Sequence, residues 1–409
     1  MNGIAMKRFV IIGAGIAGHS AALELRRLEP AAAITLIGNE TGLPYDRPPL
    51  SKEFLAGEKG PADIVLDSAP SYGELNINYM PATTITSLDP ERHKVLTEQG
   101  KEIAYDRLLL ATGSRPRKLE DVSGHVHYLR TTEDASRLRA ALRPGSRVAI
   151  IGGGFIGLEV AAAARARDCS VIVMEAGTRL LNRGMPGLLS TWVHDQHVSN
   201  GVEIMLCAGV KQIVSTEVGG VRLSLNETSL DVDVALAGIG ILPNTELAVR
   251  AGLHVEDGIV VDMHCRTSVE DVFAAGEVTS YPSAGDGPNR RTESWKTAAD
   301  QAIVAASMMA GTHASYRDPL WLWSDQFDAN IQCIGAQGPA ARHVVRGDPT
   351  SRRWTWIALD EYDRPLQAVA VNNGRDISLL RRAISMRKAL SLSAVTNPLD
   401  PFPQIQLAS

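Results

Sequence analysis

The chain is poor in cysteine and lacks the local cysteine patterns that bind metals or cycle a disulfide. Among its 409 residues there are four cysteines, far apart in sequence: Cys169, Cys207, Cys265 and Cys333. No Cys-x-x-Cys occurs, so the sequence encodes neither a thioredoxin-type redox disulfide nor a cysteine ligand set for zinc or an iron–sulfur cluster. We expect buried free thiols in a reducing cytoplasm, and no bound metal.

The sequence also lacks a basic excess and a long hydrophobic run. Its formal net charge is -5, whereas nucleic-acid-binding proteins usually show a basic balance. The first apolar stretch, Phe9 to Ala17, is short and contains glycine, so it supports neither a signal peptide nor a membrane span. We therefore expect a cytoplasmic protein of two or three domains that binds neither nucleic acid nor membrane.

Two glycine-rich turns dominate what is present. Both read Gly-x-Gly-x-x-Gly, and each follows an apolar run and precedes an alanine-rich segment, which predicts a strand, a tight turn and a helix. The first glycine permits the turn, the second lets backbone approach a pyrophosphate, and the third lets the helix pack on the strand. The glycines are Gly13, Gly15 and Gly18 in the first turn and Gly152, Gly154 and Gly157 in the second.

Acidic residues follow both turns at close to the roughly 20-residue spacing expected of a ribose-binding acid. Glu175 ends the strand after the second turn, and Asn39 and Glu40 follow the strand after the first. One such turn alone is weak evidence, but two in one chain imply that electrons pass between two dinucleotides. FAD and a nicotinamide nucleotide are the pair whose chemistry fits.

Three further stretches are candidate ligand contacts. Between Arg47 and Lys52 lie two consecutive prolines, which we expect to prevent a helix and stiffen a loop that holds both cations, although an ordinary surface loop fits the spacing equally well. A predicted strand ends at Thr112-Gly113, where backbone can touch a ligand. Another predicted strand ends at Gly276-Glu277. The Glu277 carboxylate could accept hydrogen bonds from ribityl or ribose hydroxyls, and an ordinary surface acid fits the same position.

The composition changes near residue 320, where we predict a separate C-terminal α+β domain. Four of the six tryptophans follow that point, among stretches that alternate like strands. Trp354 and Trp356 are two residues apart, so in a strand they share one face and are more often core than cofactor contacts. We expect a helix from Arg381 to Lys388.

Together the motifs carry a family resemblance over nearly the whole chain. The stretches that match are Pro44 to Lys52, Ala111 to Gly113, Gly152 to Glu159, Ile241 to Asn244, Arg266 to Ser268, Glu293 to Trp295 and Trp323 to Gln326. The sequence resembles the FAD-containing, NADH-dependent ferredoxin reductases of bacterial oxygenase systems, of the putidaredoxin reductase and biphenyl or phenylpropionate dioxygenase reductase type.

The resemblance implies a glutathione-reductase-like α/β fold with two Rossmann-like domains and an α+β C-terminal domain. The FAD domain would comprise residues 1–117 and 246–319, the NADH domain 118–245 and the C-terminal domain 320–409.

The resemblance also implies roles for individual residues. Arg47 and Lys52 would lie along the FAD, with Lys52 near the reactive flavin edge and paired with Glu159, which makes this pair the expected catalytic residues. Trp295 would sit by the flavin ring and Phe155 at the nicotinamide entrance. Two positions depart from the family pattern: Glu277 stands where aspartate usually binds the ribityl chain, and Asn39 stands where an acid is common, so either Asn39 or Glu40 takes the ribose.

The implied function is hydride transfer from NADH to FAD, followed by single-electron transfer to a [2Fe-2S] ferredoxin serving an aromatic-ring dioxygenase or a cytochrome P450. A rubredoxin reductase is the nearest alternative. A disulfide reductase or cysteine-using NADH oxidase would need a cysteine early in the chain, and none precedes Cys169. An apoptosis-inducing-factor-like binding flavoprotein would need a basic surface or a targeting segment.

A ferredoxin partner is expected to be acidic, so this acidic chain needs a local basic patch to attract it. Such a patch equally fits an ordinary solvated basic face. The candidates are Arg290, Arg291, Arg381, Arg382, Arg387 and Lys388.

Overall fold

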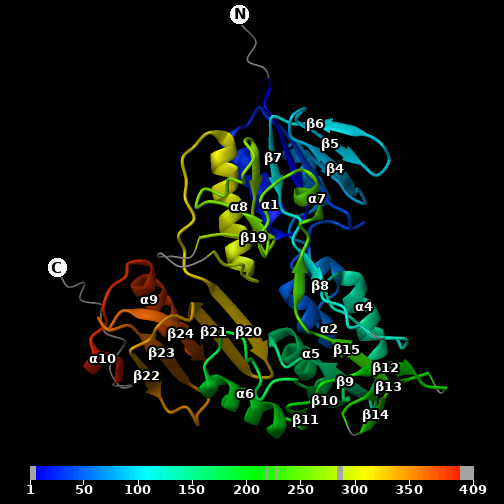
Figure 1. The fold of residues 1–409 in the computed structure, drawn as a ribbon, viewed down its shortest axis with the longest axis vertical. Coiled ribbons are helices and arrows are strands. Elements are labelled where there is room, and N and C mark those ends of the chain that lie inside the picture. The colour runs from blue at the N-terminus through cyan, green and yellow to red at the C-terminus, as the bar shows by residue number, and fades with distance from the viewer. Residues whose placement is uncertain (1–5, 121, 218, 227, 283–288, 397–409) are drawn as a thin grey trace, which may run out of the picture. The chain divides into compact units, whose positions relative to one another are not determined.

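The computed structural model describes residues 6–120, 122–217, 219–226, 228–282 and 289–396. The chain forms two compact units, coloured along the sequence in Figure 1. Unit 1 comprises Met1–Asp46, Ala62–Arg115 and Leu242–Asp318, and unit 2 comprises Arg47–Pro61, Pro116–Ile241 and Pro319–Ser409. The assignment of FAD and NADH to the predicted domains stays a prediction.

Unit 1 contains a five-stranded parallel sheet in the order β18-β7-β1-β2-β3. Its strands are β1 (Arg8–Ile12), β2 (Ala33–Ile37), β3 (Ile77–Met80), β7 (Arg107–Leu110) and β18 (Val272–Ala274). Helices α1 (Ile16–Leu28) and α8 (Trp295–Ala310) pack against each other. Ile12 pairs with both Ile37 and Leu110, so the carboxyl ends of three strands meet at one edge of the sheet.

Smaller elements complete unit 1. An antiparallel sheet contains β4 (Ile85–Asp89), β5 (Lys94–Thr97) and β6 (Glu102–Ala104). The others are η2 (Pro61–Ile64), whose first residue belongs to unit 2, α3 (Ala69–Glu74), α7 (Glu246–Arg250), β17 (Ile259–Val260) and β19 (Thr279–Ser280). The chain crosses between the units within β8 (Ser114–Pro116) and next to the start of β16 (Ile241–Pro243).

Unit 2 repeats the parallel arrangement with four strands in the order β11-β10-β9-β15. These are β9 (Arg147–Ile151), β10 (Ser170–Met174), β11 (Val202–Met205) and β15 (Val234–Ala237). Helices α4 (Thr132–Ala141), α5 (Phe155–Arg165) and α6 (Gly187–Ser199) belong to the same segment of unit 2. An antiparallel meander follows, made of β12 (Gln212–Ser215), β13 (Val221–Ser224) and β14 (Ser229–Val232).

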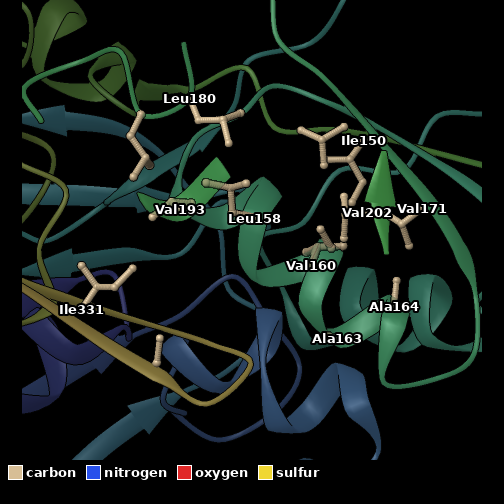
Figure 2. Close-up of a cluster of buried hydrophobic side chains, with 14 of the residues drawn as sticks. Ile150, Leu158, Val160, Ala163, Ala164, Val171, Leu180, Val193, Val202 and Ile331 are labelled. Carbon is tan, nitrogen blue, oxygen red and sulfur yellow. The ribbon is translucent and has the colours of Figure 1, made fainter. Parts of the chain in front are cut away.

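The C-terminal part of unit 2 is an antiparallel sheet in the order β20-β21-β24-β23-β22. Its elements are β20 (Trp321–Gln326), β21 (Ala329–Gly335), β22 (Arg342–Gly347), β23 (Trp354–Leu359), β24 (Pro365–Val371), α9 (Gly374–Ser385) and α10 (Leu392–Thr396). Trp354 and Trp356 are buried, so the prediction that they are core residues is confirmed. Ile331 of β21 belongs to the same hydrophobic cluster as Leu158 of α5 (Figure 2).

Two local predictions were wrong. Residues Pro48–Ser51 form a 3-10 helix, η1, which α2 (Glu53–Ala56) follows, although two prolines were expected to prevent a helix there. Both prolines occupy the first turn, where the fixed proline φ and the missing N–H are tolerated. The expected helix from Arg381 to Lys388 begins at Gly374 and ends at Ser385, and Arg387 lies beyond it with a φ of 50°. In the described part of the chain, every helix is too short or too polar to span a membrane.

Two dinucleotide turns and a buried ion pair as the candidate functional site

The first glycine turn joins β1 to α1 in unit 1. A Cβ at Gly13 would lie 2.0 Å from the Ala111 carbonyl oxygen, and one at Gly18 would lie 1.8 Å from that of Gly13, so packing of the protein itself requires both glycines. Gly15 differs, because its φ of -76° suits any residue and no atom of the described residues lies within 4 Å of its Cβ position. The open position lies at the N-terminus of α1, where backbone N–H groups can bind an anion.

The second glycine turn, between β9 and α5 in unit 2, repeats this division of roles. A Cβ added at Gly152 would lie 2.4 Å from the carbonyl oxygen of Gly238. A Cβ added at Gly157 would lie 2.2 Å from the carbonyl oxygen of Gly152. At Gly154, φ is -83° and the described structure places nothing within 4 Å of the Cβ position. In both turns, then, the central glycine serves neither the backbone nor the packing. Close approach of a ligand would explain the central glycine, and the predicted ligand is a dinucleotide pyrophosphate.

Thr112-Gly113 lies at the same sheet edge as the first turn and is held by Asn244. The Thr112 hydroxyl donates to the Asn244 carbonyl oxygen (2.8 Å), and the Asn244 side-chain amide donates back to the Thr112 carbonyl oxygen (2.8 Å). The Asn244 N–H also donates to the Gly113 carbonyl oxygen. These bonds explain why asparagine ends the Ile241 to Asn244 stretch, a role that sequence reasoning missed.

The acidic residue after β2 is held by a side chain. The Tyr45 hydroxyl donates to Glu40 Oε2 over 2.6 Å, whereas Asn39 is exposed. The indole N–H of Trp295, the first residue of α8, donates to Asp46 Oδ1 over 2.6 Å. Tyr45 and Asp46 were not predicted as site residues, although both lie in the Pro44 to Lys52 stretch. Tyr45 holds the predicted Glu40, and Asp46 holds the predicted Trp295.

Gly276-Glu277, after β18, is held by the buried Gln301 of α8. The Gly276 N–H donates to Gln301 Oε1 (2.9 Å), and Gly276 has a φ of 88°. A Cβ at Gly276 would lie 3.3 Å from the Ala17 side chain, so this turn is close to the start of α1. Glu277 is therefore near the first glycine turn. Gln301 was missed because a lone glutamine in an alanine-rich helix gives no signal.

Glu175, at the end of β10, is held by backbone rather than by a side chain. Its Oε2 accepts the N–H of Gly153 and its Oε1 accepts that of Gly177, each over 2.7 Å. The carboxylate is thus fixed beside the second turn, as expected of an acid that binds the adenosine ribose. Arg179, four residues on, donates from Nη1 to Ser190 Oγ over 2.6 Å.

Lys52 and Glu159 form the predicted ion pair inside unit 2. Lys52 Nζ lies 3.0 Å from Glu159 Oε1, and the two side chains are 11% and 2% exposed. Glu159 Oε2 accepts the Ser51 hydroxyl (2.5 Å), and Oε1 accepts the Ser324 hydroxyl (2.6 Å). Burial raises the pKa of Glu159, and the charge of Lys52 and the two hydroxyls oppose that rise. The place of this pair beside a flavin stays a prediction.

Arg47 and Phe155 are the other predicted ligand contacts in unit 2. Arg47 Nη1 donates to the Arg130 carbonyl oxygen over 2.6 Å, which fixes the guanidinium at the start of η1. Phe155 is the first residue of α5 and is half-buried against the hydrophobic core. Their contacts with FAD and nicotinamide remain predictions.

The two candidate basic patches differ in accessibility. The Arg291 side chain is 11% exposed and lies 3.3 Å from carboxylates of both Asp257 and Glu293, and Arg290 lies over the ring of Tyr281. Arg382 and Arg387 are exposed, with no ion pair to any residue in the described ranges. The neutralised Arg291 is poorly suited to attract a partner.

Comparison with known proteins is consistent with these features. Residues 7–302 match the pyridine nucleotide-disulphide oxidoreductase family, and residues 321–404 match the reductase C-terminal family. The ferredoxin--NAD(+) reductase component of the anthranilate 1,2-dioxygenase system of Burkholderia cepacia is 42% identical, over 92% of this chain and 94% of that protein. Putidaredoxin reductase of Pseudomonas putida is 34% identical, over 98% of this chain and 97% of that protein.

Solved structures agree. The reductase in the covalent putidaredoxin reductase–putidaredoxin complex has a TM-score of 0.92 and 32% identity, over 97% of each chain. The ferredoxin reductase for the CYP199A2 system from Rhodopseudomonas palustris has a TM-score of 0.90 and 31% identity, over 95% of this chain and 97% of that one. These matches confirm the predicted resemblance and fold class. The chain therefore belongs to the pyridine nucleotide-disulphide oxidoreductase family and carries that family's two Rossmann-like domains together with a reductase C-terminal domain.

Proposed function

We propose that this protein is an FAD-containing, NADH-dependent reductase that passes single electrons to a [2Fe-2S] ferredoxin serving an oxygenase, either an aromatic-ring dioxygenase or a cytochrome P450. The observation that carries the proposal is similarity along nearly the whole chain to proteins named as reductases of such systems. The two open glycine turns support it, because this reaction needs one site for each dinucleotide.

The residues of unit 1 fit FAD, which when bound accepts a hydride and releases electrons one at a time. The space at Gly15 suits the pyrophosphate. Glu40 is better placed than Asn39 to bind the ribose, because the Tyr45 hydroxyl fixes its carboxyl group whereas Asn39 is exposed. Glu277 would bind the ribityl chain, and Asp46 would hold Trp295 for contact with the flavin ring.

The residues of unit 2 fit NADH. The space at Gly154 suits the pyrophosphate of the coenzyme, and the anchored Glu175 would accept the two ribose hydroxyls. A 2′-phosphate at that place would meet the carboxylate, which favours NADH over NADPH. Lys52, held by Glu159, supplies a positive charge in a shielded site and so orients the reacting groups.

Thiol chemistry is a poor alternative for this chain. Cys265 of unit 1 is buried and donates to the Gln301 carbonyl oxygen, and burial raises the pKa of its thiol. Burial also raises the pKa of Cys333, to about 12. A nucleophilic cysteine needs a lowered pKa and access, so a disulfide reductase or a cysteine-using NADH oxidase is disfavoured. All four cysteines are free thiols, and three of them are buried as expected, but Cys207, which follows β11, is exposed, so the expectation of burial was wrong for it. Free thiols favour the cytoplasm as the compartment.

Ferredoxin would dock on a basic surface of this chain. Exposure and lack of described ion-pair partners favour the surface that contains Arg382 and Arg387 over the pair Arg290 and Arg291. Lys388 and Arg381 flank that surface and are half-buried. Attraction there would be electrostatic, because these basic side chains would attract an acidic ferredoxin although the chain as a whole is acidic.

Steady-state oxidation of NADH with a panel of acceptors tests the function. The purified protein should be yellow, should release FAD on denaturation, and should reduce [2Fe-2S] ferredoxins faster than rubredoxin or oxygen. Faster reduction of rubredoxin would support a rubredoxin reductase, and faster reduction of oxygen would support an NADH oxidase. Release of FMN would contradict the assignment of the first turn, because FMN has no pyrophosphate.

A further inference from the structure

Strand β20 carries polar side chains into the interior of unit 2. Ser324 and Gln326 are two residues apart and therefore share one face of the strand. They are 0% and 3% exposed, whereas the intervening Asp325 is exposed and accepts a hydrogen bond from Asn330. Buried polar side chains are costly unless they are hydrogen-bonded. The resemblance of the Trp323 to Gln326 stretch to the family does not by itself explain why these two polar side chains are buried.

A continuous line of hydrogen bonds runs from α6 through β20 to α5. His197 Nε2 and Gln326 Oε1 are 2.9 Å apart, Gln326 Nε2 donates to Ser324 Oγ over 3.0 Å, and Ser324 Oγ donates to Glu159 Oε1 over 2.6 Å. All four side chains are buried. The C-terminal sheet therefore contacts the carboxylate that pairs with Lys52.

The direction of these bonds is set by the Gln326 amide. Its NH₂ group faces Ser324, so its carbonyl oxygen faces His197, and His197 Nε2 must carry the proton. Reversing the amide would make its oxygen compete with Glu159 for the single Ser324 proton. Burial lowers the pKa of His197, which keeps the imidazole neutral. Every donor in the line thus points toward Glu159.

The donors that converge on Glu159 favour its charged form. Elements α2, β9, β10, β20 and η1 pack against α5, and from them Lys52 is the charged group that faces Glu159. Ser51 and Ser324 each donate a hydroxyl to it, and His197 is the other titratable group of the cluster. Hydrogen bonds donated to a carboxylate stabilise it relative to the neutral acid.

We propose that Ser324 and Gln326 are positioning residues that hold Glu159 as a carboxylate and thereby keep Lys52 fixed and charged. Through them the C-terminal domain sets the charge state of a pair that belongs to the nucleotide-binding part of unit 2. The proposal rests on the proposed function for its meaning in catalysis, but the ionisation of Glu159 can be measured without turnover.

The test is a pH titration of the Glu159 carboxyl by ¹³C NMR of protein labelled at glutamate Cδ, with Glu159→Gln identifying the signal. Ser324→Ala should raise the titration midpoint by about one to two pH units, because it removes a charge-assisted bond. Gln326→Ala should raise the midpoint by less. Ser324→Thr keeps the hydroxyl, so its midpoint should stay at the wild-type value. The pH profile of NADH-dependent flavin reduction should shift in the same direction.

Thr355→Val is the matched control. The Thr355 hydroxyl also donates to a buried carboxylate of the C-terminal sheet, Asp376 Oδ2, over 2.8 Å, but it lies in a separate cluster with Arg346. A shift in Ser324→Ala and Gln326→Ala with none in Thr355→Val would support the proposal. An unchanged midpoint in folded Ser324→Ala, or equal shifts in all three variants, would overturn it. Failure to reduce ferredoxin would count only against the proposed function.

Discussion

The two glycine turns are nearly the same structure, yet their surroundings differ in kind. In both, the outer glycines are required by packing and the central one faces open space. In unit 1 the following acid, Glu40, is held by a tyrosine hydroxyl, whereas in unit 2 Glu175 is held by two backbone N–H groups. The turn itself therefore provides only a place for a pyrophosphate. We expect its neighbours to decide which dinucleotide binds and how firmly.

The polar side chains buried in each unit also differ. In unit 1 a neutral glutamine, Gln301, accepts the Gly276 N–H. In unit 2 an acid, Glu159, accepts two hydroxyls and pairs with Lys52. A neutral side chain costs less to bury than a charge and does not change with pH, whereas a buried carboxylate depends on every partner that stabilises its charge. We therefore expect the cluster around Glu159 to make unit 2 sensitive to pH.

The largest expected effect comes from filling the two open positions. Gly15→Val should give protein that has lost most of its FAD, and Gly154→Val should keep FAD but raise the KM for NADH. Each bulky side chain would overlap the pyrophosphate, so binding should weaken at least about 100-fold. Flavin content measured by absorbance and NADH kinetics at fixed FAD check the two outcomes separately.

Gly73→Val and Gly187→Val are the matched controls, because these glycines of units 1 and 2 also have no described atom within 4 Å of the Cβ position. Both should keep FAD and an unchanged KM. Normal FAD content in Gly15→Val would show that the first turn does not bind the cofactor. Loss of FAD from both turn variants would remove the distinction between the two sites.

The next largest effect should come from removing Lys52. Lys52→Met leaves Glu159 buried without its cation, which should lower the free energy of unfolding by about 3–5 kcal/mol at pH 8. The double variant Lys52→Met, Glu159→Leu should be less destabilised, because no charge remains buried. Urea unfolding measures both, and flavin reduction by NADH should follow the same order.

The pH dependence of that loss has a definite sign. The pKa of Glu159 lies above its ordinary value of 4.5, and Lys52→Met raises it further because the charge of Lys52 is the largest opposing influence. The folded state then binds the proton more tightly than the unfolded state, so stability falls as pH rises from about 4.5 through the folded-state pKa. Lys52→Met should thus be closer to wild type at pH 5 than at pH 8. An equal loss at both pH values, or additive losses in the double variant, would contradict coupling.

Sequence reasoning found the parts of this site that are local in the chain. The strand, turn and helix around Gly13 and Gly152 follow from spacing and glycine, so both were predicted without a structure. The partners of those parts come from distant segments and carry no local pattern. Asn244, Gln301 and Tyr45 hold predicted residues through hydrogen bonds whose geometry depends on the fold.

The wrong predictions share a different cause. Consecutive prolines were expected to exclude a helix at Pro48–Ser51, but the position of a proline within a helix matters more than its presence. The helix expected to begin at Arg381 was placed by its charges, whereas α9 is set by apolar residues such as Ile377 and Leu380, which are buried. The spacing of the apolar residues would have located both ends of α9 better than its charged residues did.

A smaller effect should come from Glu175, the acid held by backbone. Wild type should prefer NADH to NADPH about 10- to 1000-fold, since charges about 4 Å apart repel by roughly 4 kcal/mol at an effective dielectric near 20, before screening. Glu175→Ala should reduce this preference. Glu175→Gln should also weaken the turn, because its NH₂ group would face one of the two N–H donors. Values of kcat/KM for both coenzymes measure the preference, and equal wild-type values would contradict it.

The smallest expected effect comes from reversing the charge of Arg382, a change that should affect docking of the ferredoxin but not hydride transfer from NADH. Arg382→Glu should lower the rate of ferredoxin reduction about 3- to 10-fold at low salt, mainly through association. Reduction of ferricyanide by NADH should be nearly unchanged, because a small acceptor needs no docking surface. Arg352→Glu is the matched control: this exposed arginine pairs with Asp328 and lies outside the proposed surface.

Salt dependence gives this last prediction its force, since both reversals change the net charge equally. If docking occurs at Arg382, added salt should slow the wild type toward the rate of the variant, because screening removes the attraction that the mutation reverses. Arg352→Glu should keep the full salt response of the wild type. Equal losses in both variants would mean that net charge alone steers the ferredoxin. Equal losses with ferredoxin and ferricyanide would mean that the mutation had damaged the fold, and a salt-independent wild-type rate would place docking on a different, uncharged surface.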